Sequence, residues 1–447
     1  MINRTQISTK LDQLPIEALA NQTNFSVHQD NELTAHSFIM GFFMMLTTGN
    51  NTLCSWAEKV SFLLKRVFSK SAISAKLQYR QLDFVTALLE HTLCNQFYQG
   101  YVDNLSSNLL STFPRVFVED SMCVKLPSNL ANVFPGAHSK TGEAATARIQ
   151  CRVDLKNNQI SRLDIQSYRD NDQKFSSDVL HTLRPGDLVL RDLGYWSLKV
   201  FQLIDWMNAF FLTRFRYGTN VYDKNTGEQI DLAKVLGTAK KQGQQVVELQ
   251  VYVGKKVKLP ARLVAIRVPQ EIEQSRRRKA LKDRNQRTNH SDEYLDLLAW
   301  TIFITNVPVG IWTPKQMLKV YGYRWRIEII FKAWKSQFKF EQFFKTKQQL
   351  SAPRAEITLR LLLIWITLFF VRLFNFFLSK VYNQKQKFVS ILKFAKFFKE
   401  HFGQLIGYPD WNFYIELVAQ YCTYDKRKGV PNFCESLYLT ENEIFTI

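Results

Sequence analysis

The sequence predicts an α/β fold flanked by helical regions at both ends, and three observations lead to this prediction. Residues 1–105 carry apolar clusters at helix-like spacing, for example at 38–46 and 82–94. From Arg115 onward, apolar residues alternate along short runs as they do in strands, and a helical segment follows these runs. Beyond Pro353, the apolar stretch 361–378 has the character of a long buried helix.

Five segments organise the chain. We expect a helical N-terminal domain at 1–105, the first part of an α/β core at 106–217, a mainly β insertion at 218–306, a core helix within 307–350 and a helical C-terminal region at 351–447. In the core, strands are expected at 116–120, 147–155, 160–167, 187–192 and 209–215, and a helix at 198–207. In the insertion, basic loops are expected to separate strands at 246–253, 263–268 and 300–305.

The charge of the chain indicates a polyanionic partner. Lys and Arg total 59 against 39 Asp and Glu, a formal net charge of +20. Such a chain must meet a polyanion or tolerate considerable self-repulsion. Nucleic acid is the first candidate and an acidic membrane surface is the second. The aromatic share of 14% marks a folded chain rather than a disordered basic tail.

Cysteine usage and the apolar segments indicate a cytoplasmic protein. The six cysteines form no C-x-x-C pair, so we expect reduced thiols. The polar N-terminus lacks the apolar run of a signal peptide. Arg360 and Arg372 break the apolar stretch 357–378, so its uninterrupted middle is shorter than the ~20 residues of a membrane span. A buried core helix is the better interpretation.

The segment 321–335 carries the clearest chemical pattern. On one helix, Tyr321, Arg324, Glu328 and Lys335 lie at offsets of 0, 3, 7 and 14, which places them on a single stripe. A carboxylate can bind a divalent metal, and cations beside it can hold the phosphate that the metal polarises. The alternative is that Arg324 and Glu328 form an ordinary ion pair on a solvated helix.

These four residues match the Y-x2-R-x3-E-x6-K signature of bacterial insertion-sequence transposases of the insertion-sequence-four family. The surrounding residues also resemble the Tn5-type members. The resemblance implies a transposase of the DDE type with an RNase H-like core. It also implies two aspartates upstream, which complete a carboxylate triad with Glu328.

Two aspartates match the positions that the resemblance requires. Asp120 follows the strand-like residues 116–118 and precedes Ser121, whereas the neighbouring Glu119 would face the other side of the strand. Asp192 ends a later strand before Gly194 and Tyr195. The family's usual basic residue after this aspartate is Leu193 here, which puts a local DNA contact in doubt. As isolated features, the two aspartates would more often be turn residues at strand ends, but their order, with strands before them and the signature helix after them, favours the triad.

The resemblance also implies the metal and the reaction. Three carboxylates would hold two Mg²⁺ ions, with Mn²⁺ as a substitute, and no His or Cys cluster with zinc spacing competes. The reaction would be in-line attack on a phosphodiester. Hydrolysis would free the 3′ end of the transposon, a hairpin would release the element, and the 3′-hydroxyl would then attack target DNA in cut-and-paste transposition.

Two features suggest further DNA contacts. The run 255–287 holds twelve basic residues against three acidic ones and includes Arg276, Arg277, Arg278 and Lys279. Such a run is either a solvated loop or a surface that neutralises phosphates. Trp300 resembles the position at which related transposases stack a flipped base, and a core Trp on a strand is an equal alternative.

The resemblance implies double-stranded DNA as the partner, both as transposon inverted-repeat ends and as target. The N-terminal domain and the C-terminal region would share recognition of the ends. In the N-terminal domain, the segment 82–97 is either a recognition helix or a packing helix. The C-terminal region would also join a homodimer during synapsis. The expected location is the bacterial cytoplasm, on DNA and without a membrane. The alternatives are a catalytically silent transposase-derived DNA-binding protein, an RNase H-like nuclease or resolvase, and a membrane-anchored protein.

Overall fold

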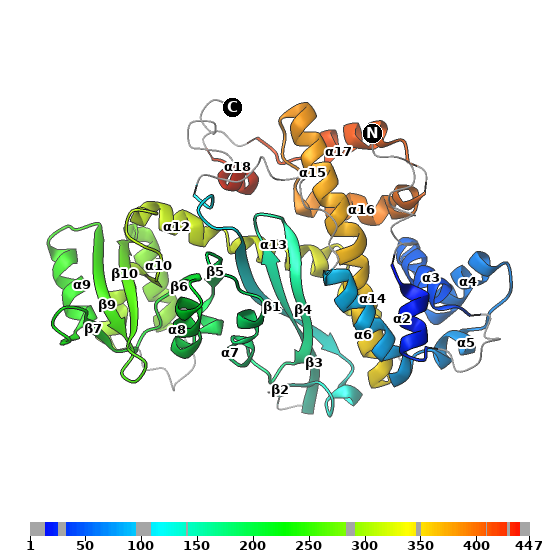
Figure 1. Ribbon diagram of the computed structural model, residues 1–447, viewed down its shortest axis with the longest axis horizontal. Helices are drawn as coiled ribbons and strands as arrows, with labels where there is room; N and C mark the ends of the chain where they lie inside the picture. Colours follow the sequence, from blue (N-terminus) through cyan, green and yellow to red (C-terminus); the bar gives the residue numbers. More distant parts are fainter. Residues whose placement is uncertain are drawn as a thin grey trace.

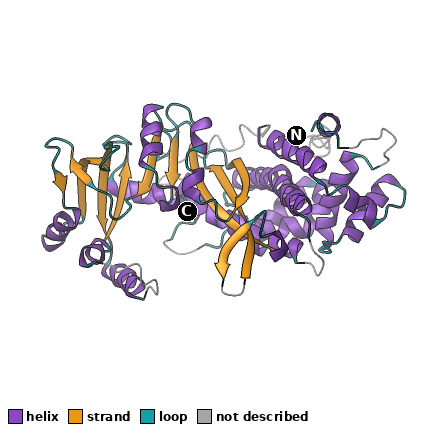
Figure 2. Cartoon of the chain, turned by 90° about the horizontal axis from the view of Figure 1, so that it is seen from below, coloured by secondary structure: helices purple, strands orange, loops and turns teal. Residues whose placement is uncertain are grey.

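The computed structural model describes residues 14–25, 33–94, 109–139, 142–282, 291–345, 350–407, 409–426 and 430–438. It is a mixed α/β structure with one large sheet in the middle and helices at its flanks (Figure 1). Seen from below, many of the helices gather at one end of the molecule, and the strands lie toward the other end with further helices beside them (Figure 2).

The N-terminal region is helical because apolar residues recur on one face of each helix and polar side chains cap the helix starts. Its helices are α2 (Ile16–Gln22), α3 (Ala35–Thr48), α4 (Leu53–Leu64), α5 (Lys70–Ala75) and α6 (Tyr79–Cys94). Thr34, Thr52 and Ser69 each accept a hydrogen bond from a backbone N–H of the first helical turn. The candidate recognition helix 82–97 coincides with α6 up to Cys94, and 95–97 lie outside the described residues.

The central sheet follows the order β2-β3-β1-β5-β6-β11-β10-β9-β7-β8, and β4 pairs with β3. Its core strands are β1 (Val116–Leu126), β2 (Pro135–Ser139), β3 (Gly142–Asp154), β4 (Gln159–Ser167), β5 (Leu188–Arg191) and β6 (Phe210–Arg214). The strands β7 (Val221–Asp223), β8 (Gln229–Ile230), β9 (Val246–Val253), β10 (Leu259–Arg267) and β11 (Trp300–Thr305) extend it. The strands β1, β5 and β6 are mutually parallel, whereas β3 is antiparallel to β1.

The register of the parallel strands places two aspartates at one level. Glu119 of β1 lies opposite Arg191, the last residue of β5. Asp120 and Asp192 are the next residues along these two strands. Because neighbouring strands lie about 4.8 Å apart, this register brings the two carboxylates to the same edge of the parallel pair.

Short helices connect the core strands and cover the sheet. They are η1 (Ser128–Leu130), α7 (Asp172–Phe175), η2 (Asp178–His181), η3 (Leu193–Tyr195) and α8 (Leu198–Trp206). The helix α8 starts at the cap Ser197 and buries Val200, Phe201 and Ile204.

The region 218–306 contains more helix than the sequence suggested. Besides its strands it holds α9 (Leu232–Lys241), α10 (Gln270–Leu281) and α11 (Asp292–Leu297). The basic run 255–287 therefore holds β10 and, where a loop was expected, the helix α10, and residues 283–290 lie outside the described part. Glu271 and Glu273 in the first turn of α10, with Arg278 and Lys279 in its last, complement the helix dipole.

The core helix expected within 307–350 is divided in two. The helix α12 (Pro314–Gly322) starts with a capping box formed by Thr313 and Gln316, and α13 (Trp325–Ser336) follows after a tight turn. Within this turn the amides of Arg324 and Arg326 donate to carbonyls three residues earlier, at 3.1 and 3.0 Å. The short helix η4 (Phe340–Phe344) completes the segment.

The C-terminal region is built around one long apolar helix. It comprises α14 (Ala352–Trp365), a π-helical turn (Ile366–Phe370), α15 (Val371–Lys385), α16 (Ile391–Ile406), α17 (Trp411–Tyr421) and α18 (Phe433–Tyr438). By length and composition the run Ala352–Lys385 could cross a membrane, but 89% of its apolar window is buried inside the protein. Burial of this kind favours the interpretation as a core helix.

Candidate active site

Asp120 lies within β1, on the opposite face from Glu119. The Glu119 carboxylate is fully buried and pairs with Arg152 at 2.9 Å and Arg191 at 2.7 Å. The Asp120 carboxylate points the other way, is partly exposed, and accepts a hydrogen bond from the Ser121 amide at 2.8 Å. The alternation of side chains along a strand thus separates a structural carboxylate from an accessible one.

A single guanidinium gathers the three predicted carboxylates. Arg324 donates to Glu328 at 2.7 Å across the first turn of α13, and its Nη1 lies 3.5 Å from Asp120 Oδ2. Its Nε lies 4.0 Å from Asp192 Oδ1. The three acidic groups therefore share one cation, although Asp120 and Glu328 lie more than 200 residues apart in the sequence.

The electrostatics of the site are those of crowded carboxylates. Burial raises the pKa of Asp120 to about 6, and the negative charges of Asp192 and Glu328 also raise it. The Ser121 amide and the Arg324 guanidinium lower this pKa in part. Burial alone would lower the pKa of Arg324, but the surrounding phenol and carboxylates raise it above its usual value.

The donor set of the site suits a hard divalent cation. Asp120, Asp192 and Glu328 offer only carboxylate oxygens, the ligands that Mg²⁺ prefers. Within the described part of the chain, no three His, Cys, Asp or Glu side chains are close enough to hold an ion as they stand. The Arg324 guanidinium lies among the three carboxylates, and its buried Nε has no hydrogen-bond partner.

The other two signature residues lie on either side of this centre. The Tyr321 hydroxyl is 3.4 Å from Asp192 Oδ1, and burial of the phenol raises its pKa. Lys335 lies in the last turn of α13 and is exposed. Tyr321, the first residue of the signature, is therefore buried beside the carboxylates, and Lys335, the last, lies at the protein surface. The chain turns between them, at the junction of α12 and α13.

Arg214 and Trp325 are among the residues beside the site that sequence reasoning missed. Arg191 of β5 lies opposite Thr213 of β6, so Arg214 stands next to Asp192, and its Nη2 is 3.5 Å from Asp192 Oδ1. The position of Arg214 at the end of the neighbouring parallel strand could have indicated that it lies beside Asp192. Trp325, the residue after Arg324, is 58% exposed, which is unusual for so large an apolar side chain.

Trp300 lies at the wall of a pocket of about 440 Å³. Its ring is 3% exposed, with the Arg267 guanidinium 5.6 Å from the ring centroid, and its buried indole N–H has no hydrogen-bond partner. The pocket is lined by Leu193, Arg214, Phe215, Tyr217, Arg276, Lys279, Ala280, Tyr294, Leu297, Leu298, Trp300, Thr301 and Ile302. Because Leu193 and Arg214 belong to it, the pocket adjoins the Asp192 side of the carboxylates.

The four basic residues singled out in the sequence lie on α10 and differ in their surroundings. Arg276 donates to the Trp300 carbonyl at 3.0 Å, and Arg277 donates to a backbone carbonyl of α11 at 3.2 Å. Arg278 and Lys279 are exposed. Two of the four therefore bind backbone carbonyls of neighbouring elements, and the other two face solvent.

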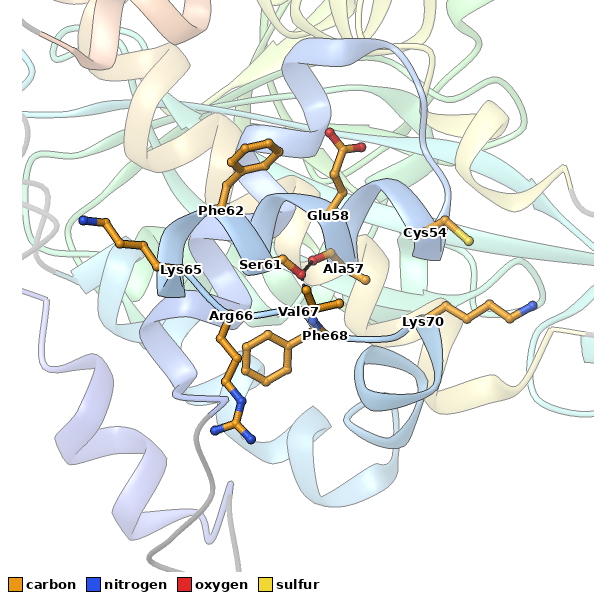
Figure 3. Close-up of a pocket in the computed structure, with 10 residues that line it drawn as sticks. All are labelled: Cys54, Ala57, Glu58, Ser61, Phe62, Lys65, Arg66, Val67, Phe68 and Lys70. Carbon is orange, nitrogen blue, oxygen red and sulfur yellow. Dashed lines mark hydrogen bonds between the residues drawn. The ribbon is translucent and has the colours of Figure 1, made fainter.

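A second pocket, of about 620 Å³, lies in the N-terminal helical region (Figure 3). It is lined by Cys54, Ala57, Glu58, Ser61, Phe62, Lys65, Arg66, Val67, Phe68 and Lys70. Glu58 is the one carboxylate in this lining, and it pairs with Lys59 at 3.1 Å. The lining combines apolar side chains with Lys65, Arg66 and Lys70, and it lacks the acidic cluster found around Arg324.

Comparisons with known proteins identify the family of the chain. The family model described as "Transposase DDE domain" matches residues 111–365. The chain is 31% identical over 322 residues to the transposase for insertion sequence element IS231B of Bacillus thuringiensis subsp. berliner, covering 68% of this chain and 66% of the relative. It is 26% identical over 358 residues to the transposase for insertion sequence element IS1151 of Clostridium perfringens, covering 76% and 75%.

The match thus spans slightly less than two thirds of the length of the IS231B relative, and 59% of the length of the IS231F transposase of Bacillus thuringiensis subsp. israelensis, at 30% identity. Among solved structures, the piggyBac transposase in a synaptic complex with hairpin DNA aligns with a TM-score of 0.45 and 12% identity, covering 97% of this chain and 87% of that one. A TM-score of this size does not establish a common fold. The family model covers more than half of the chain, from β1 to the end of α14, and the chain therefore belongs to the family of proteins with a transposase DDE domain.

Proposed function

We propose that this protein is a DNA transposase that cuts and rejoins DNA by phosphoryl transfer, with Asp120, Asp192 and Glu328 as its catalytic triad. The observation that carries the proposal is the placement of these carboxylates around Arg324, at 3.5, 4.0 and 2.7 Å. Membership of the DDE family supports it. The match of Tyr321, Arg324, Glu328 and Lys335 supports the finer placement in the insertion-sequence-four family.

We further infer an RNase H-like core. The support is the strand order β4-β3-β1-β5-β6, in which an antiparallel meander joins a parallel pair. In this arrangement one candidate ligand lies on the first strand, one follows the neighbouring strand, and one lies on a helix packed near both.

The three carboxylates would hold two Mg²⁺ ions, or Mn²⁺ in their place. When bound, such ions activate the attacking oxygen and stabilise the leaving oxygen of a phosphodiester. For the protein's own residues to bind them, Asp120 must be ionised and Arg324 must release at least part of its contact with the carboxylates. The released guanidinium is then available to hold a DNA phosphate.

DNA contacts are assigned to the residues around this centre. Tyr321, Arg324 and Lys335 would hold phosphates of the strand being cut. The lining of the Trp300 pocket combines aromatic side chains with three cations, Arg214, Arg276 and Lys279, which suits a base removed from its stack. The exposed residues of α10 would add affinity by neutralising phosphates without reading sequence.

For the N-terminal and C-terminal regions, we infer the roles that the family resemblance implies. The N-terminal region 1–105 would bind the transposon ends, and the presence of Lys65, Arg66 and Lys70 in the lining of its pocket supports a contact with an acidic partner. The C-terminal region 351–447 would join two copies of the protein during synapsis. Cut-and-paste transposition in the bacterial cytoplasm follows from these roles.

The experiment that tests the function uses the purified protein, Mg²⁺ and duplex DNA carrying the terminal repeats that flank its coding sequence. We expect nicking at the repeat boundary. Asp120→Ala, Asp192→Ala and Glu328→Ala should abolish nicking while DNA binding persists, and Glu228→Ala, which removes an exposed carboxylate, should leave it unchanged. Undiminished nicking by any one of the three variants removes that residue from the triad.

A further inference from the structure

Asp172 stands beside both aspartates of the site without belonging to the triad. It is the first residue of α7, and its side chain is 20% exposed. Its Oδ1 accepts three hydrogen bonds, from Ser121 Oγ at 2.7 Å, Arg148 Nη1 at 3.0 Å and Gln150 Nε2 at 3.0 Å. A carboxylate oxygen with this many donors is held in one position by β1 and β3 together.

On one side, Asp172 acts on Asp120 through Ser121. The hydroxyl of Ser121 donates to Asp172, and the amide of the same residue donates to Asp120 Oδ1 at 2.8 Å. The bond to Asp172 therefore fixes the residue whose amide orients the Asp120 carboxylate. Outer partners of this kind set the direction of metal-binding side chains.

On the other side, Asp172 packs against the backbone that follows Asp192. A Cβ atom at Gly194 would lie 2.9 Å from Asp172 Oδ2, so a larger residue at this position would force the Asp172 carboxylate to shift. The next residue, Tyr195, donates to Gln150 Oε1 at 2.5 Å. The turn after Asp192 is thus held against the same group of side chains that holds Ser121.

The position of Asp192 depends on this packing because Asp192 lies outside the hydrogen-bonded strand. The strand β5 ends at Arg191, one residue earlier. The side-chain contacts of Asp192 with Tyr321, Arg214 and Arg324 are long, at 3.4, 3.5 and 4.0 Å. The position of its carboxylate is therefore set largely by the turn that follows it.

We propose that Asp172 is a positioning residue, which fixes Asp120 and Asp192 relative to each other through Ser121 on one side and Gly194 on the other. The inference rests on the proposed function, since it concerns the two aspartates of the triad. It predicts that loss of Asp172 weakens metal binding at the triad and leaves DNA binding intact.

The test compares Asp172→Ala with Asp170→Ala. Asp170 is a matched control because it lies on the same loop but pairs with Lys174 at the surface. Two readouts are taken: the rise in Tm on adding Mn²⁺ to the protein without DNA, and the Mn²⁺ concentration that gives half-maximal nicking. For Asp172→Ala we expect a smaller Tm rise and a metal requirement increased about ten- to hundred-fold, as for other partners of metal ligands. Asp170→Ala should behave as the wild type.

Gly194→Ala provides the second arm, which remains informative if Asp172→Ala does not fold. The added methyl group meets the Asp172 carboxylate, so this variant should also raise the metal requirement. In the double variant the carboxylate is gone, and the defect should equal that of Asp172→Ala alone rather than the product of the two. Asp172→Asn, which keeps the shape but loses the charge that pairs with Arg148, should fall between Asp172→Ala and the wild type.

The inference is overturned if the metal titrations of Asp172→Ala and Asp170→Ala superimpose, or if the defects of Asp172→Ala and Gly194→Ala multiply. Failure of the proposed function gives a different pattern. The wild type would then fail to nick, and Asp120→Ala would respond to Mn²⁺ as the wild type does.

Discussion

Glu119 and Arg191 form a fully buried ion pair at 2.7 Å, immediately before the two candidate catalytic aspartates on adjacent parallel strands. Arg152 joins the pair from β3 at 2.9 Å. Burial alone would raise the pKa of Glu119, but the two guanidinium groups lower it below its usual value, so this carboxylate stays charged. The ion pair fixes the register that sets Asp120 beside Asp192.

Glu119→Ala should therefore destabilise the fold. It leaves two buried guanidinium groups uncompensated, and breaking a buried pair in this way costs about 3–5 kcal/mol. Chemical denaturation measures the free energy of unfolding, with Asp164→Ala as a control, since Asp164 pairs with Arg162 at a half-exposed position. An unfolding free energy equal to that of the control would contradict this role for Glu119.

The pKa of Asp120 predicts how stability depends on pH in the metal-free protein. This pKa is raised from 3.8 to about 6, so the folded state binds the proton more tightly than the unfolded state. The stabilising contribution of this group is complete below pH 3.8 and is lost as the pH rises through about 6. Above that, the charged carboxylate costs up to about 3 kcal/mol.

Asp120→Asn removes this charge at every pH. It should raise the free energy of unfolding at pH 8, by up to about 3 kcal/mol, and by much less at pH 4. Denaturation at the two pH values, with EDTA present, measures the difference. Equal effects at both would mean that the pKa of Asp120 is not raised.

Two hypotheses exist for Trp300: it is a core residue, or it stacks on a flipped DNA base. Trp300→Ala should destabilise the fold by about 3–5 kcal/mol, because the ring is buried. Trp300→Phe keeps a flat ring and should be tolerated better. A 2-aminopurine at the terminal base of the repeat should change its fluorescence on binding to the wild type and the Phe variant.

The control for this measurement is Trp312→Phe, which alters another buried Trp whose indole donates to the Leu109 carbonyl. Base stacking at Trp300 is refuted if the fluorescence of the probe is the same bound and free. A core role alone then accounts for the buried ring.

The helix α10 should contribute non-specific affinity for DNA. Arg278→Ala and Lys279→Ala should each weaken duplex binding and reduce the slope of log affinity against log salt concentration by about 0.9 for every phosphate that is no longer neutralised. The nicking position should not change. Lys241→Ala, at an exposed residue in the last turn of α9, is the control. Slopes that match the control would remove α10 from the DNA interface.

Much of the core could be predicted from the sequence because its strands are short, alternating and punctuated by turns. The strands that carry or precede Asp120 and Asp192 follow this pattern, and the opposite facing of Glu119 follows from the pleat alone. The helix α10 was missed because it lacks apolar periodicity. Its helix-forming residues and the placement of its charges were the available signal.

The ion pair between Arg324 and Glu328 could be predicted from their spacing of four residues. The other contacts within the site could not be predicted, because they depend on register and on one turn. Arg214 stands beside Asp192 only through the pairing of β5 with β6. Arg324 meets all three carboxylates because the chain turns between α12 and α13, where the sequence predicts a continuous helix. Asp172 lies far from the signature in sequence and reaches the site only through the folding of α7 onto β1 and β3. The catalytic roles of the triad remain predictions.

The most direct test of the central claim is an anomalous difference map at the manganese edge, from crystals of the protein grown with Mn²⁺ and DNA ends. The account predicts density between the carboxylates of Asp120, Asp192 and Glu328, with Arg324 turned away from at least one of them. Manganese bound elsewhere, with Arg324 still among the three carboxylates, would contradict it.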